Sequence, residues 1–237
     1  MSSELAALLP RIRQRSAQRT YRFAMTGTDP WKAPLEDGRP LYAHAMMACM
    51  EGDAARLREL LMGLPSQDDI GDLLEFNGWP DETTLLKAAS SQGHLDVVKL
   101  IVSCGADPND NGSDVTDDND STCKVPLHLA AACGHVDVVR WLVREGGADV
   151  RQCDRNGCNA YHLGCVQGHT DVVQFLVKEA GLDMDEPEAF GGTGLGWALK
   201  RGHADLAQWL REQGALPYTC GSSEDRGAKG VGAIYSY

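Results

Sequence analysis

The sequence predicts an all-α fold, a solenoid of helix–turn–helix units joined by β-turn or hairpin connections. The first observation is a stretch with helical apolar spacing, whose copies are Thr84–Asp107, Val125–Val150, Asn159–Asp183 and Thr193–Ala215. The second is a Gly-His pair in the middle of each copy, beginning at Gly93, Gly134, Gly168 and Gly202. Two short helices with opposed apolar faces cannot bury those faces alone, so such units are expected to stack.

The clearest copy, Val125–Val150, shows how one unit is built. Pro126 presets the φ angle of a first helical turn, where its missing N–H is not needed. Gly134 can adopt the left-handed conformation that ends this helix, and Gly146-Gly147 closes a second one. The apolar faces of the two helices are formed by Leu127, Ala130, Ala131, Val138, Val139, Leu142 and Val143.

The early copies are farther apart in the sequence than the later ones. A weaker copy at Ala43–Leu61 has Gly52-Asp53 at the Gly-His position. The early copies therefore carry insertions, Gly63–Pro80 and Pro108–Cys123, which are expected to lie in turns. Apolar residues in the first insertion predict a short helix there, namely Ile70, Leu73, Leu74 and Phe76.

These features resemble the ankyrin repeat family. The residues that carry the resemblance are Val125-Pro126-Leu127-His128-Leu129-Ala130, the four Gly-His pairs and Gly105-Ala106-Asp107. The resemblance covers residues 38–216, with repeats near 38–62, 80–109, 120–150, 154–184 and 188–216. It implies a curved stack of β-turn–helix–helix units that binds other proteins through its concave face and turn tips.

The composition narrows the class of partner. A net charge of −12, from 22 basic and 34 acidic residues, argues against nucleic acid or an anionic membrane as the default partner. No apolar run approaches the roughly 18 residues of a membrane span. The 8 cysteines fall mostly at small-residue positions of the repeat and we expect no signal peptide, which favours a reduced protein in the cytoplasm, with the nucleus as an alternative. We also expect a monomer with no cofactor.

Both ends of the chain lie outside the repeats. Residues 1–37 combine an apolar helical pattern with several arginines, and we expect a helical cap over the first repeat. The alternative for this segment is an organelle transit segment or a partner-binding arm. Residues 217–237 are rich in Gly, Ser and charge without periodicity, so they are predicted to be disordered. The alternative for Ile234–Tyr237 is a recognition tag.

The second insertion suggests a different function. Its residues match the spacing of a calcium-binding loop at Asp107, Asn109, Asn111, Gly112 and Asp118, with Asp in place of the usual final Glu. Such oxygen ligands suit Ca²⁺. However, Asp114 stands where these loops usually hold an aliphatic residue, and no EF-hand helix pair flanks the loop. A calcium-responsive regulator is therefore the alternative to a solvated acidic loop.

The histidines and cysteines indicate a scaffold and no enzyme. In the family, imidazoles at two repeat positions are expected to bond to turn and neighbouring-repeat backbone, here His94, His135, His169 and His203 at one position and His128 and His162 at the other. The cluster Cys153, Cys158, His162 and Cys165 lacks the paired spacing of zinc knuckles. Cys165 with His169 lacks a third partner and an oxyanion loop. We therefore predict no catalytic residue and no metal site.

The partner-binding surface is predicted from the repeat template, which turns variable side chains outward at turn tips and near the end of each first helix. The predicted residues are Ser91, Gln92, Ala132, Cys133, Arg155, Asn156, Cys158, Val166, Gln167, Phe190, Lys200 and Arg201. Its charged members, Arg155, Lys200 and Arg201, are all positive. We expect a non-catalytic protein–protein interaction module whose partner presents an acidic segment, with Phe190 supplying buried area.

Overall fold

The computed structural model describes residues 40–76, 83–110 and 124–216. In these ranges the regular structure is helical and no strand occurs, so the predicted all-α solenoid is confirmed. The helices are α2 (Leu41–Glu51), α3 (Ala54–Met62), α4 (Gln67–Leu74), α5 (Leu85–Gln92), α6 (Leu95–Ser103), α7 (Pro126–Ala132), α8 (Val136–Arg144), α9 (Ala160–Gln167), α10 (Thr170–Lys178), α11 (Gly194–Arg201) and α12 (Ala204–Glu212). None of these described helices is long and apolar enough to cross a membrane. The predicted N-terminal cap, 1–37, and disordered tail, 217–237, lie outside the described residues.

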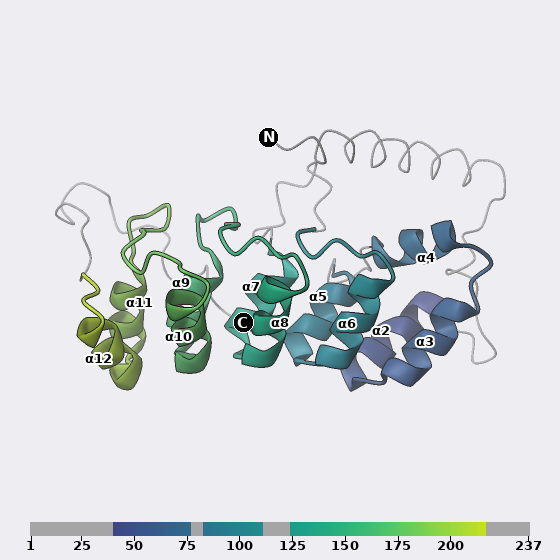
Figure 1. The fold of residues 1–237 in the computed structure, drawn as a ribbon, viewed down its shortest axis with the longest axis horizontal. Coiled ribbons are helices and arrows are strands. Elements are labelled where there is room, and N and C mark those ends of the chain that lie inside the picture. Colours follow the sequence, from purple (N-terminus) through teal and green to yellow (C-terminus); the bar gives the residue numbers. More distant parts are fainter. Residues whose placement is uncertain (1–39, 77–82, 111–123, 217–237) are drawn as a thin grey trace.

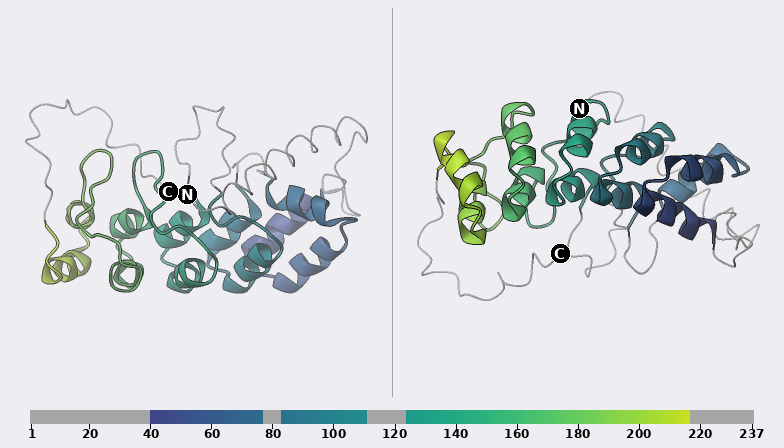
Figure 2. Two further views of the ribbon diagram at one scale, coloured as in Figure 1. Left: turned by 45° about the horizontal axis from the view of Figure 1, so that its top comes forward. Right: turned by 90° about the horizontal axis from the view of Figure 1, so that it is seen from below.

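All of these helices except α4 form pairs, α2–α3, α5–α6, α7–α8, α9–α10 and α11–α12, that lie in a row along the longest axis of the molecule (Figure 1). The first helices pack on one another in the order α2, α5, α7, α9 and α11. The second helices form a parallel layer in which α3 contacts α6, α6 contacts α8 and α8 contacts α10. Figure 2 shows the two layers from other directions. Each pair therefore buries its apolar surface against its neighbours.

Two residues led by a glycine connect the helices of four units, as Gly-His in α5–α6, α9–α10 and α11–α12 and as Gly-Asp in α2–α3. Helices α2, α5, α9 and α11 end at glycines in the left-handed region, with φ of 77°, 78°, 79° and 81° at Gly52, Gly93, Gly168 and Gly202. Helix α7 ends one residue earlier, and Gly134 again has a φ of 80°. Any side chain with a Cβ atom is disfavoured in that region by about 1–2 kcal/mol. Glycine therefore makes this two-residue turn possible.

Small residues line the contact between first helices. The fully buried alanines of these helices are Ala45, Ala48, Ala89, Ala130, Ala131, Ala160 and Ala198. The second helices contribute larger side chains to the same core, including Val138, Val139 and Leu142 of α8. A small side chain leaves room for two helix backbones to approach closely. The predicted burial of Ala130 and Ala131 is confirmed.

Aromatic rings and cations link neighbouring second helices. Phe175 on α10 is buried, and the guanidinium carbons of Arg140 and Arg144 on α8 lie 5.5 and 5.6 Å from its ring centroid. Lys178 on α10 places its ammonium nitrogen 5.2 Å from the ring centroid of Trp209 on α12. A cation over an aromatic face is attracted by the ring quadrupole, by about 0.5–1 kcal/mol at exposed sites. These contacts connect the last three pairs along their outer layer.

The first insertion forms helix α4, as its apolar spacing predicts. Ser66 caps the helix by accepting a hydrogen bond at Oγ from the backbone N–H of Asp69, at 3.3 Å. Leu73 and Leu74 are buried in the common core. The ring of Phe76, just after the helix, lies edge-to-face against Tyr42 of α2 with centroids 4.6 Å apart. Helix α4 thus extends the core beside the first pair.

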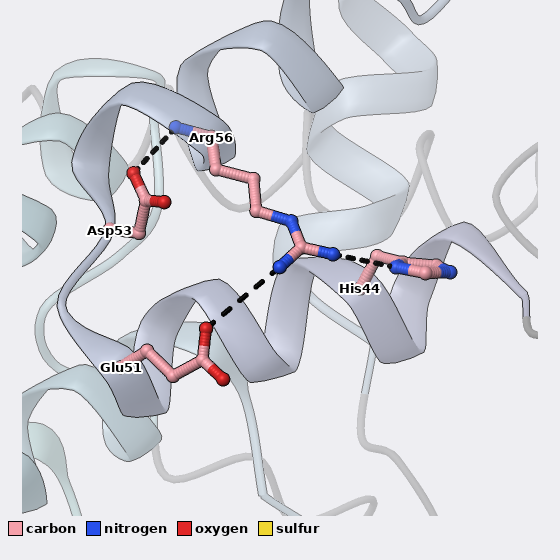
Figure 3. Close-up of polar contacts among 4 residues, drawn as sticks. All are labelled: His44, Glu51, Asp53 and Arg56. Atoms are coloured by element: carbon pink, nitrogen blue, oxygen red, sulfur yellow. Dashed lines mark hydrogen bonds and ion pairs between the residues drawn. The ribbon is translucent and has the colours of Figure 1, made fainter.

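In the first helix pair, α2–α3, the position of the Gly-His histidine is taken by Asp53, and Arg56 makes polar contacts with α2 (Figure 3). Asp53 stands at the histidine position and accepts a hydrogen bond from the backbone N–H of Arg56 at 2.9 Å. The guanidinium of Arg56 donates to Nδ1 of His44 at 3.1 Å, and its other terminal nitrogen lies 3.8 Å from Glu51. Arg56 therefore connects α3 to both ends of α2.

Candidate functional site

The histidines of the four Gly-His pairs connect each helix pair to the one before it. The Nε2 atoms of His94, His135, His169 and His203 donate to the backbone carbonyls of Met50, Ser91, Ala132 and Val166, at 3.0, 2.8, 2.9 and 3.0 Å respectively. A carbonyl oxygen can only accept, so each ring must carry a proton on Nε2. The prediction that these imidazoles bond to neighbouring-repeat backbone is confirmed.

Each of these rings also lies close to the glycine that ends the preceding first helix. A Cβ atom at Gly93 would lie 2.3 Å from Nδ1 of His135, and one at Gly168 would lie 2.4 Å from Nδ1 of His203. Both distances are far below a van der Waals contact. The glycines are therefore required twice, for their backbone conformation and for the space that the next histidine occupies.

The other recurrent histidines, His128 and His162, fix the turns before the first helices. Nε2 of His128 donates to the carbonyl of Gln152 at 2.8 Å, while its Nδ1 accepts from the backbone N–H of Val125. His162 makes the same two kinds of bond, with Nε2 donating to Glu186. Burial lowers the pKa of both imidazoles because it disfavours the charged ring. Both side chains are used structurally, as predicted.

The cysteine cluster does not form a centre for chemistry. Cys158 and Cys165 are fully buried, whereas Cys153 is exposed. Burial raises the pKa of the Cys165 thiol, which keeps this sulfur protonated and poorly nucleophilic. His169, its proposed base, is engaged with the carbonyl of Ala132. Within the described parts of the chain, no three His, Cys, Asp or Glu side chains gather in a way that would hold a metal ion.

Two hairpin loops, 154–158 and 188–192, precede the first helices of the last two repeats, and each is stabilised by a buried carboxylate. The Asp154 carboxylate is buried and accepts from the backbone N–H groups of Asn156 and Cys158, both at 2.9 Å. The Glu188 carboxylate does the same in the next loop, where it accepts hydrogen bonds from the backbone N–H groups of Phe190 and Gly192. The backbone N–H of Ala189 donates to the carbonyl of Asn156 at 3.0 Å, which joins the two loops. The loop tips are therefore ordered relative to each other.

The structure presents only part of the predicted contact set to solvent. The exposed members are Gln92, Cys133, Arg155, Phe190, Lys200 and Arg201, and the half-buried ones are Ser91, Asn156 and Gln167. The expectation that Ala132, Cys158 and Val166 face outward is wrong, because these side chains are 7 %, 0 % and 1 % exposed. They pack with Leu163 and Trp197 in a small apolar cluster under the loops. Their side chains are not available to a partner.

Two residues of α11 matter at this surface but were not among the predicted contacts. Trp197 is buried and carries the ammonium of Lys200 4.6 Å from its ring centroid, so this lysine is held over the indole. Leu199 is 42 % exposed although it lies on a first helix. The sequence signal for Leu199 is a large apolar side chain at the position three before the helix-ending glycine, where Ala131 and Cys165 stand in the preceding repeats.

The proposed calcium loop is only partly described. Residues 111–123, with most of its ligand positions, lie outside the described ranges. Asp107 accepts the backbone N–H of Asn109 at 2.8 Å, and the side-chain oxygen of Asn109 accepts the backbone N–H of Asp149 at 2.7 Å. Asp107 thus holds the turn itself and Asn109 ties the turn to the next repeat, and a cation would have to compete with those bonds.

Comparison with known proteins agrees with this architecture. A family model described as ankyrin repeats in three copies matches residues 110–188, and a model of the single ankyrin repeat matches residues 81–113. The matched regions contain α5 to α10 and the hydrogen-bonding histidines between them.

Two curated relatives are similar over part of the chain. The palmitoyltransferase AKR1 of Lachancea kluyveri is 30 % identical over 122 residues, which is 51 % of this chain and 14 % of that protein. The tRNA endonuclease ANKZF1 of Bos taurus is 31 % identical over 90 residues, which is 36 % of this chain and 12 % of that protein. The chain therefore matches only a small part of each relative. The stacked helix pairs, the Gly-His turns and the family matches together show that the chain belongs to the ankyrin repeat family.

Proposed function

We propose that this chain is a non-catalytic module that binds a partner protein through the concave face and loop tips of its last three repeats. Ankyrin repeats indicate a protein–protein interaction module. The observation that carries the proposal is that the residues able to do chemistry are used inside the stack, while a different set of side chains is exposed. The recurrent histidines and buried cysteines are used inside the stack, whereas Arg155, Phe190, Lys200 and Arg201 are presented to solvent. The exposed set suits recognition better than catalysis.

The charges at the loop tips favour an acidic partner segment. In the tips formed by residues 154–158 and 188–192, the carboxylates of Asp154 and Glu188 are 6 % and 4 % exposed and accept backbone N–H groups. The cation at the same tips, Arg155, points outward. Phe190 is 57 % exposed and offers an apolar anchor. Charges of this kind mainly speed encounter and set specificity, and a buried aromatic residue contributes affinity.

The test is a charge reversal with a matched control. Once a partner is captured by affinity purification, Arg155→Glu with Arg201→Glu should slow its association at low salt by about tenfold and flatten the salt dependence. The control is Arg58→Glu with Lys99→Glu, which makes the same change in net charge at exposed positions of α3 and α6. Equal association rates for the two double variants would place the partner elsewhere.

The calcium-responsive regulator remains the alternative function. Its described residues, Asp107 and Asn109, bond to neighbouring backbone and do not favour it over an acidic loop. Calorimetric titration would show a Ca²⁺ site that Asp107→Ala with Asp118→Ala removes. Absence of heat at millimolar calcium would leave the acidic loop. We further propose a cytoplasmic monomer, to be tested by light scattering and by imaging of the tagged chain.

A further inference from the structure

At two junctions of the stack, a side chain in the turn after one helix pair bonds to the turn after the next pair. The side-chain oxygen of Asn109 accepts the backbone N–H of Asp149 at 2.7 Å, and its amide nitrogen donates to the carbonyl of Gly147 at 3.1 Å. The carboxylate of Asp185 accepts the backbone N–H of Leu216, also at 2.7 Å. These turn bonds join the second pair to the third and the fourth pair to the fifth.

The turns after the second, third and fourth pairs are built alike. In each turn an aspartate side chain accepts the backbone N–H of the residue two positions later. The pairs are Asp107 with Asn109 at 2.8 Å, Asp149 with Arg151 at 2.9 Å and Asp183 with Asp185 at 2.9 Å. The side chain that makes the turn bond at the other two junctions is therefore replaced by that of Arg151 at the junction between the third and fourth pairs.

This junction lacks the turn bond. A guanidinium has donors only, so Arg151 cannot accept the backbone N–H of Asp183, which is the counterpart of the bonded N–H groups at the other junctions. Among the described residues, no group accepts from this N–H and Arg151 forms no ion pair. Both residues are exposed. Two kinds of donor, a guanidinium and a backbone N–H, are thus left together at the surface.

The donors suit an external carboxylate. A repeated contact that is lost at one place in a regular fold indicates a functional position, because such exceptions gather at functional sites. A guanidinium binds carboxylates through short, charge-assisted hydrogen bonds. We propose that Arg151 and the backbone N–H of Asp183 receive an Asp or Glu side chain of the partner. One carboxylate oxygen accepts from the N–H, as Asp185 accepts from Leu216, and the other accepts from the guanidinium. This inference rests on the acidic partner of the proposed function.

The acids of these turns make direct bonding the condition for binding. Asp149, Asp183 and Glu186 are exposed, and the first two each use one oxygen within their own turn. Like charges oppose the diffuse attraction of an anion, so a carboxylate is retained only through the two donors. The competing ligand is an amide side chain of a partner. It would match the Asp183 N–H and the carbonyl of Gly181, as Asn109 matches the third turn.

Titration of the ¹⁵N-labelled full chain with a capped hexaglutamate peptide tests the site by nuclear magnetic resonance. The amide signal of Asp183 should shift saturably, and the midpoint should rise about tenfold in Arg151→Gln because a charge-assisted bond is lost. Lys99→Gln removes the same charge from an exposed position on α6 and should keep the midpoint within about twofold. A capped hexaglutamine peptide should leave the Asp183 signal in place.

A second variant tests the missing turn bond without any ligand. Arg151→Asn introduces the residue that makes this bond at position 109, so its side chain should accept from the Asp183 N–H and donate to the Gly181 carbonyl. Exchange of the Asp183 amide hydrogen with water should slow about three- to tenfold, as expected for one net hydrogen bond. Hexaglutamate should no longer shift the Asp183 signal in this variant, since the N–H is already bonded.

Any one of four results would overturn the proposal. They are no shift of Asp183 at millimolar hexaglutamate, equal midpoints in Arg151→Gln and the parent, an equal shift with hexaglutamine, and unchanged amide exchange in Arg151→Asn. Failure of the proposed function is distinguishable from these. If Arg155→Glu with Arg201→Glu slows the association of a captured partner while Arg151→Gln leaves its affinity unchanged, the loop tips bind the partner and the Arg151 site does not.

Discussion

The contact between each helix-ending glycine and the next histidine gives a quantitative prediction at Gly168. The residue has a φ of +79°, and a Cβ there would lie 2.4 Å from Nδ1 of His203 and 2.7 Å from its Cγ. In Gly168→Ala, the left-handed backbone costs about 1–2 kcal/mol. Displacing the ring from a packed interface adds about 1–3 kcal/mol. We therefore expect a total loss of about 2–5 kcal/mol in the free energy of unfolding.

Gly181→Ala is the matched control. Gly181 has a φ of +71°, and among the described residues nothing lies within 4 Å of its built Cβ. This variant has the backbone cost alone, about 1–2 kcal/mol. The difference between the two variants isolates the glycine–imidazole contact. A third variant, Gly168→Ala with His203→Ala, removes the overlapping ring, so its loss should be smaller than the sum of the single losses.

Urea unfolding followed by circular dichroism gives the stability of each variant. Repeat arrays can lose cooperativity, so hydrogen exchange of α11 and α12 should accompany it. Because repeat stability depends on nearest-neighbour interfaces, Gly168→Ala should accelerate exchange in α11–α12 more than in α5–α6. Equal destabilisation by Gly168→Ala and Gly181→Ala would refute the reasoning, since it would leave only the backbone term.

Three further predictions concern burial and the outer layer. Because burial lowers the folded-state pKa of His128 and His162, the unfolded chain binds more protons than the folded chain below the unfolded histidine pKa of about 6.5. The free energy of unfolding from urea titrations should therefore be constant above that pH and fall below it, by at most about 1.4 kcal/mol per pH unit for each histidine, and His162→Gln should remove the contribution of His162. Ala130→Leu should lower the free energy of unfolding by about 1–3 kcal/mol, because Ala130 is fully buried between helices; an unchanged thermal midpoint would contradict this. Lys178→Met should cost about 0.5–1 kcal/mol through its lost cation contact with Trp209, and Lys99→Met on α6 serves as the comparison.

Repeated features could be predicted from the sequence because each copy supports the others. The Gly-His turns, the buried alanines of α7 and the insertion helix α4 all follow from local spacing. The contact between Arg56 and His44 could not be predicted, because the first repeat departs from the pattern that would align these residues.

The candidate site was harder to predict because a single-repeat template omits the neighbouring repeat. The position two before the helix-ending glycine is 54 % exposed at Met50 but 1 % exposed at Val166. The same position is thus exposed or buried according to what packs beside it. In the later repeats, the loop at Cys158 and the indole of Trp197 cover Val166. Exposure at a repeat position is therefore a property of the stack, which no single copy of the motif contains.

Stability and recognition should separate in this protein, since they use different atoms. The interfaces between pairs depend on imidazoles, backbone carbonyls and small buried side chains. The charge reversal uses Arg155 and Arg201, which are both exposed, and leaves Lys200 in its contact with Trp197. That double variant should keep its free energy of unfolding within about 1 kcal/mol of the parent, as expected for exposed charges. Ala130→Leu should reduce binding only in proportion to the folded fraction that it loses. A charge-reversed protein that unfolds at the midpoint of Ala130→Leu would show that these arginines support the stack, and the surface assigned to the partner would then be structural.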